Sequence, residues 1–148
     1  MSFHFPLQAL LHLRQSIEHQ HELRLRAANQ LVARVRHLIE QVDTRLHQLH
    51  AGQSQDLGTG TSGAELRFAV SCEEHLLRQR QSMQRELVRL QGLRDEQQRI
   101  FQQARRDRET FESLRDHQLR EYQREARRSE QRQQDDVFLM RQAYLRRD

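Results

Sequence analysis

The 148-residue sequence has very few of the residues that interrupt helices or fill layered cores. It contains one proline, five glycines, no tryptophan and only 5% aromatic residues, and its mean hydropathy is −1.01. With 35% hydrophobic residues, it has too little apolar material for a layered globular core. Arginine, glutamine, glutamate and leucine are abundant instead. This composition is typical of long helices that bury an apolar seam, as in a coiled coil.

The single cysteine, Cys72, excludes an internal disulfide and favours a reducing compartment. No stretch approaches the ~18 consecutive apolar residues of a membrane-spanning helix. The N-terminus lacks the basic start, apolar run and cleavage site of a secretory signal. We therefore expect a soluble, cytoplasmic protein.

All 25 basic residues are arginine and none is lysine, but 21 acidic residues reduce the net charge to +4. The charges are interleaved at helical spacing, as in Glu86 with Arg89 and Glu121 with Arg124, which is typical of a solvated helix face. Without a basic block or stacking aromatics, we do not predict a nucleic-acid partner. An arginine-rich coiled coil that binds nucleic acid and a homo-oligomeric scaffold remain the alternatives.

The first half of the chain predicts one helix, from about residue 6 to about residue 51. Pro6 suits a first helical turn, and Gly52 suits the residue just after a helix. Leu10, Leu13 and Ile17 are expected to continue its apolar stripe upstream. Apolar residues recur at alternating three- and four-residue steps: Ala28, Val32, Val35, Ile39, Val42, Leu46 and Leu49.

The second half predicts another helix, from about residue 63 to about residue 145. Ser62 and Glu65 form a capping box, in which each residue satisfies a free N–H group of the other. Arginine and glutamine also fall at or beside inward positions, namely Arg80, Arg94, Gln97 and Arg108. Its apolar positions again have helical spacing: Leu76, Met83, Leu87, Leu90, Leu93, Phe101, Ala104, Phe111, Leu114 and Tyr122.

Two such helices joined by a turn at residues 52–62 predict an all-α fold, a single antiparallel coiled-coil hairpin over residues 1–148. If the turn centres near Gly58, residue i of the first helix faces about residue 116 − i of the second. Residues 113–148 would then overhang or fray without a partner helix. Their last third is apolar, which favours an interaction with another molecule.

Catalytic, cofactor and metal sites are not predicted. Gly58, Gly60 and Gly63 match a dinucleotide-binding pattern, but a helix precedes them instead of a strand, and a phosphate-binding loop would need lysine. The histidines, including His47 and His50 on one helix face, do not form a convergent set of ligands. We therefore expect no enzyme activity, no cofactor and no small-molecule ligand.

Two stretches resemble the FliJ family of the flagellar type III export apparatus. "FHFPLQALLHLRQSIEHQ" (residues 3–20) is similar to the opening of its members, and "FESLRDHQLREYQREARRSEQRQQDD" (residues 111–136) is similar to their C-terminal pattern. The resemblance implies a cytoplasmic coiled-coil stalk, peripherally associated with the inner membrane through the export apparatus. It also implies that the chain binds the export ATPase ring, the export gate membrane protein and empty export chaperones. The equivalent stalk of a virulence-type injectisome is a related possibility.

The resemblance also suggests where these partners would bind. The ATPase contacts would lie at the two chain termini, remote from the glycines. The gate-binding face would lie on both helices near the turn, at Leu38, Val42, Leu49, Cys72, Leu76, Gln79 and Met83.

Overall fold

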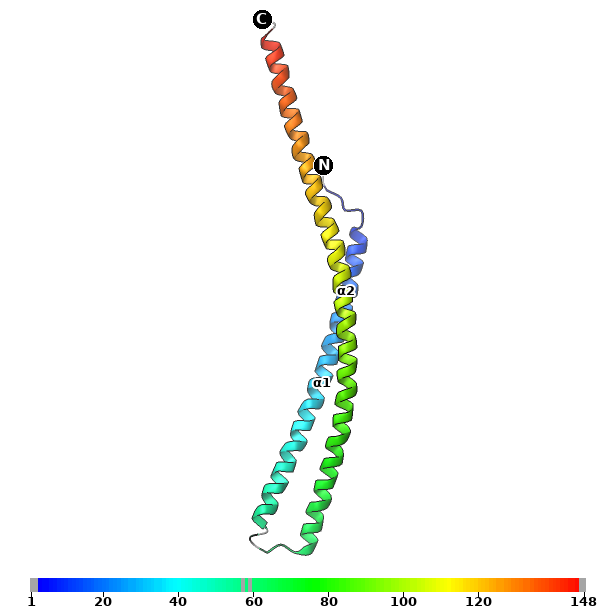
Figure 1. Ribbon diagram of the computed structural model, residues 1–148, viewed down its shortest axis with the longest axis vertical. Coiled ribbons are helices and arrows are strands. Elements are labelled where there is room, and N and C mark those ends of the chain that lie inside the picture. Colours follow the sequence, from blue (N-terminus) through cyan, green and yellow to red (C-terminus); the bar gives the residue numbers. More distant parts are fainter. Residues whose placement is uncertain (1–2, 57, 59, 147–148) are drawn as a thin grey trace. The chain divides into compact units, whose positions relative to one another are not determined.

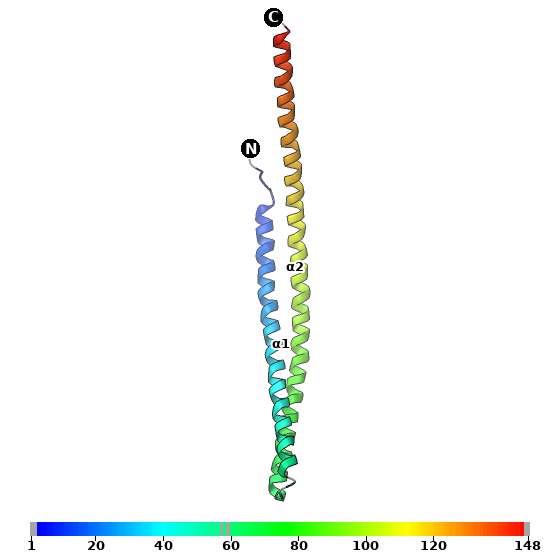
Figure 2. The same ribbon diagram turned by 90° about the vertical axis from the view of Figure 1, so that its left-hand side faces the viewer.

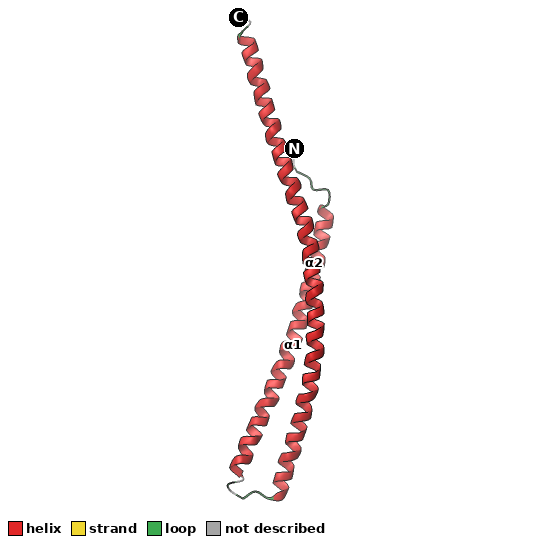
Figure 3. Cartoon of the chain, viewed as in Figure 1, coloured by secondary structure: helices red, strands yellow, loops and turns green. Residues whose placement is uncertain are grey.

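A computed structural model describes residues 3–56, 58 and 60–146. Two helices account for nearly all of them, α1 at Gln8–Asp56 and α2 at Gly63–Leu145 (Figure 1). Figure 3 shows helices joined by loops, and no strand occurs within the described ranges. The helices pack against each other, so the predicted all-α helical hairpin is confirmed.

The capping box forms at the start of α2. The Ser62 N–H donates to Glu65 Oε2 at 2.9 Å, and the Glu65 N–H donates to Ser62 Oγ at 3.3 Å. Before it, Gly60 has a φ of 90°, a left-handed conformation that favours glycine. Gly60 and the capping box together reverse the chain and start α2.

The end of α1 differs from the prediction. The helix continues through Gly52 to Asp56, so the turn is shorter than the predicted residues 52–62. A glycine inside a helix costs only about 1 kcal/mol relative to alanine, which neighbouring turns can offset. The hydroxyl of Ser54 donates to the His50 carbonyl at 2.9 Å within this extra segment. Gly52 therefore lies within the helix and does not end it.

The chain comprises two compact units, each with one segment of α1 and one of α2. The first unit contains residues 1–18 and 103–148, and the second contains residues 19–102. In the first unit the buried apolar side chains are Phe5, Leu11 and Ala104. In the second unit they are Ala28, Val32, Val42, Leu46 and Leu90.

The sequence placed the upstream apolar stripe of α1 on a face of the helix that does not pack against α2. Leu10 and Leu13 are exposed, while Leu11 is fully buried, with Arg14 and Glu18 half-buried beyond it. Residues 11, 14, 18, 21, 25 and 28 keep the same alternating three- and four-residue steps as the apolar seam downstream. The seam thus continues through polar residues, which an apolar pattern cannot reveal. On α2, Leu93 and Leu114 are likewise exposed, outside the seam.

The helices of the second unit pair in a different register from the prediction. Asp43 was expected opposite Glu73, but its Oδ1 accepts a hydrogen bond from Arg80 Nε at 2.6 Å. Glu73 instead contacts His50, with 2.9 Å between Oε1 and Nε2. Each partner lies seven residues further along α2 than predicted, which is one heptad. The longer α1 moves the centre of the turn towards α2, which shifts the register in this direction.

The overhang also begins later than residue 113. In the first unit the rings of Phe3 and Tyr122 lie 5.7 Å apart, so the N-terminal segment reaches this level of α2. Every residue from 127 to 146 is exposed. In Figures 1 and 2 the red end of α2 has no other segment beside it. The unpartnered segment is therefore residues 127–146.

No helix in the described ranges is both long enough and apolar enough to cross a membrane.

Candidate interaction surfaces

The residues predicted to bind the export gate lie along the paired helices of the second unit, at differing depth. Val42 is only 2% exposed and has almost no surface available to a partner while the helices are paired. Leu38 is exposed, at 37%. The remaining predicted residues are half-buried: Leu49, Cys72, Leu76, Gln79 and Met83.

Four of these residues share one strip of α2, which we call the turn-proximal strip. Two neighbouring shallow hollows run along it and have His75 and Arg78 in common. One is completed by Ser71, Cys72 and Leu76, and the other by Gln79, Ser82 and Met83.

Sequence reasoning did not include His75, Arg78 or Ser82 in this surface. His75 lies three residues from Cys72 and Ser82 lies three residues from Gln79, and this spacing was the available signal. No such spacing from a predicted residue indicated Arg78. Arg78 is exposed, and its Nε donates to the Glu74 carbonyl at 3.2 Å. The strip therefore combines half-buried apolar groups with a cation and an imidazole.

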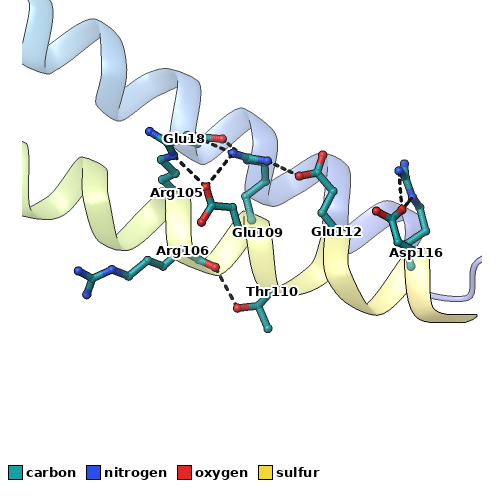
Figure 4. A network of polar contacts seen from close by, with 9 residues as sticks. Glu18, Arg105, Arg106, Glu109, Thr110, Glu112 and Asp116 are labelled. Carbon is teal, nitrogen blue, oxygen red and sulfur yellow. Dashed lines mark hydrogen bonds and ion pairs between the residues drawn. The ribbon is translucent and has the colours of Figure 1, made fainter.

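An ion-pair network occupies the helix contact of the first unit (Figure 4). Arg108 Nε donates to Glu18 Oε2 at 2.6 Å across the two helices, and its other nitrogens contact Glu109 and Glu112. The side chains of Glu18 and Arg108 are only 18% and 19% exposed. The hydrogen bond that Arg108 donates to Glu18 is the main reason that the pKa of Arg108 is raised above its ordinary value. Arg108 is thus a permanent cation held between acids from both helices.

A second cross-helix pair lies nearby in the same unit. Arg14 Nη1 is 3.3 Å from Asp107 Oδ2, and its guanidinium carbon lies 5.9 Å from the centre of the Phe111 ring. Gln103 donates to the other oxygen of Asp107 at 2.9 Å. Charged seam residues are therefore paired on both helices, as burial of charge requires.

The unpartnered segment 127–146 exposes a concentration of large apolar side chains. Two hollows lie along it and share Arg141. Exposed large apolar residues concentrated in this way mark an interaction site more often than a solvated face. The exposed apolar residues are Val137, Phe138, Leu139, Met140, Tyr144 and Leu145.

The part of the chain that the structure describes offers no cluster of three or more histidine, cysteine, aspartate or glutamate side chains for a metal ion. Leu57, which precedes the glycine-rich pattern, and Thr59, which lies inside it, are outside the described residues. The pattern follows helix α1 and leads into α2, so the strand that a dinucleotide site needs does not precede it.

The family model described as "Flagellar FliJ protein" matches residues 3–148 of this chain. Comparisons with curated proteins and with solved structures give no match. The match includes both helices and both resembling stretches, "FHFPLQALLHLRQSIEHQ" and "FESLRDHQLREYQREARRSEQRQQDD". This chain belongs to the FliJ family of flagellar proteins.

Proposed function

We propose that the protein is a non-enzymatic coiled-coil stalk that binds the export ATPase ring, the export gate and export chaperones to promote type III export. Membership of the FliJ family makes it a component of the flagellar export apparatus. The family match over residues 3–148 is the observation that carries the proposal. In this account it acts in the cytoplasm, associated peripherally with the inner membrane through its partners.

The proposed ATPase-binding region is the first unit, where both chain ends lie. The apolar face of residues 127–146 supports this assignment, because an isolated helix is marginal in water and gains stability from a partner. The contact between Phe3 and Tyr122 holds the N-terminal segment against α2 beside the start of this region. A ring of ATPase subunits would cover the exposed segment on several sides.

The proposed gate-binding region is the turn-proximal strip together with Leu38. Its hollows and half-buried side chains support the contact, whereas Val42 and Leu49 would act by holding the two helices together. Substituting Cys72 and Gln79 with arginine should weaken binding to the soluble domain of the gate protein about tenfold or more. Val88→Arg, on an exposed site of the same helix, is the matched control.

The experiment compares export in a deletion strain complemented with three forms of the gene. The full chain should restore swimming and filament export. A chain ending at Ala126 should lose ATPase binding and keep gate binding, and the Cys72/Gln79 variant should do the reverse. Normal swimming of the deletion strain would refute the proposed function, and loss of both interactions in each variant would refute the assignment of regions.

A further inference from the structure

The second unit contains a hollow between α1 and α2 that the proposed function does not use. Ala28 is buried there, whereas Leu31 and Leu93 are each 43% exposed. Because alanine side chains are short, they leave space that the two leucines only partly cover. The hollow is lined by Arg24, Ala27, Ala28, Leu31, Leu93 and Gln97.

The hollow belongs to a longer row of residues with a heptad repeat. On α1, Arg24 and Leu31 lie seven residues apart beside the seam. On α2, Leu93 and Ile100 have the same spacing. A seven-residue repeat keeps side chains on one side of a helix pair, so these residues form a continuous edge, which we call the leucine edge. A third helix with its own apolar stripe is the element that fits such an edge.

Two polar groups in the hollow have no partner in the described part of the chain. Gln97 Oε1 is buried and accepts no hydrogen bond, which costs about 1–3 kcal/mol unless a donor reaches it. Arg24 forms no ion pair or hydrogen bond within the described ranges, and neither does Arg34, three residues after Leu31. The hollow is thus lined by one cation without an acidic partner, Arg24.

The charges differ between the two sides of this helix pair. On the other side of the seam, Asp43 pairs with Arg80, and His50 contacts Glu73. On the leucine edge, the α1 cations have no acidic partner, so an acidic molecule is electrostatically favoured there. The chain's own residues 127–146 contain five arginines and three acids, which makes them a poor occupant.

We propose that the leucine edge is a docking site for an acidic amphipathic helix of a partner protein. An apolar side chain of that helix inserts between Leu31 and Leu93, and a carboxylate pairs with Arg24. The site is separate from the turn-proximal strip and does not depend on gate binding.

The test uses labelled three-heptad helical peptides and fluorescence anisotropy with the full-length protein. The probe has leucine at the a and d positions and glutamate at the flanking e and g positions. A second peptide replaces every glutamate with lysine, and a third replaces every leucine with serine. We expect the first peptide to bind and the other two to bind at least about tenfold more weakly.

Leu31→Arg and Leu93→Arg should each weaken binding of the acidic peptide about tenfold or more, because the arginine side chain fills the apolar space of the hollow. Leu23→Arg places the same charge on another exposed leucine of α1 and should leave the affinity nearly unchanged. Arg24→Glu should reduce the preference for the acidic over the lysine peptide. Circular dichroism and thermal melting verify that each variant keeps its helices.

Two results would overturn the proposal. One is equal affinity of the leucine-rich and serine peptides, or equal effects of Leu31→Arg and Leu23→Arg, because binding would then be unspecific attraction to a basic protein. The other comes from sedimentation at two concentrations. If the wild-type chain is a dimer that Leu31→Arg dissociates, a second copy occupies the leucine edge instead.

Discussion

Each of the two units pairs a segment of α1 with a segment of α2, but the contacts between the helices differ in kind. In the second unit the seam is apolar, with Ala28, Val32, Val42 and Leu46 of α1 buried. In the first unit the α1 seam passes from Leu11 through charged residues that form ion pairs with α2. Burial of apolar side chains stabilises the folded state, but it tolerates a shift of one helix along the other by one heptad. A charge pair, in contrast, forms in one register only. We infer that the second unit contributes most of the stability, and that the largely buried Glu18–Arg108 pair adds to the register specificity that Asp43 and Arg80 give the second unit.

The largest change in stability is expected for a substitution in the apolar seam. Leu90→Ala removes a buried side chain and should lower the free energy of unfolding by about 3 kcal/mol. Val88→Ala, two residues away on an exposed site, is the control and should change it by less than about 0.5 kcal/mol. Chemical denaturation followed by circular dichroism measures both. Equal losses in the two variants would contradict the distinction between seam and surface.

The next effect is in the charged seam. Arg108→Met leaves Glu18 without its partner in a largely desolvated position, and should cost about 2 kcal/mol, less than for a fully buried pair. Combining Arg108→Met with Glu18→Leu should restore most of that stability. Denaturation of the two single variants and the double variant forms a double-mutant cycle. A coupling energy near zero would show that the pair contributes neither stability nor specificity.

A smaller change in the free energy of unfolding, an increase instead of a decrease, is expected at Gly52. It lies inside α1 with no heavy atom within 4 Å of an added Cβ, so Gly52→Ala should raise the free energy of unfolding by about 0.5–1 kcal/mol. Gly60→Ala is the contrasting variant and should destabilise, because its φ of 90° strains any other residue. Thermal melting distinguishes the two. Destabilisation by Gly52→Ala would place the end of α1 near residue 51 after all.

The smallest effect concerns the exposed pair on α2. The hydrogen bond from Arg89 lowers the pKa of Glu86 below its ordinary value. A carboxyl with a lowered folded-state pKa stabilises the protein above its unfolded-state pKa, and this contribution is lost as the pH falls through the folded-state pKa. Arg89→Gln should therefore remove a small part of the stability loss between neutral and acidic pH. Identical pH profiles for variant and wild type would show that the pair has no measurable effect.

Where local chemistry determined the structure, the sequence was sufficient. The Ser62–Glu65 capping box and the apolar seam of α1 both follow from residue types and spacing over short distances. The register was not predictable in the same way, because it depends on how far α1 extends beyond Gly52. Arg14 and Glu18 were not recognised as seam residues, since an apolar pattern does not detect positions stabilised by ion pairs.

The candidate interaction surfaces were also only partly predictable from the sequence. The family resemblance suggested residues along the helices near the turn, but it did not separate Val42, which is buried, from Leu38, which is exposed. Leu93 was predicted as a seam residue and instead lies exposed beside the hollow of the leucine edge. How deeply a side chain is buried in a helix pair depends on the rotation of each helix about its axis by a fraction of a turn. A single sequence does not determine that rotation.

The pairing register is the central claim, because the leucine edge depends on which residues of α1 and α2 face each other. Pulsed electron resonance between spin labels tests it directly, with a Cys72→Ser background and labels at residues 43 and 80 or at residues 43 and 73. One heptad corresponds to about 10 Å along a helix, which the method resolves. The account predicts the shorter distance for residues 43 and 80. A shorter distance for residues 43 and 73 would contradict it.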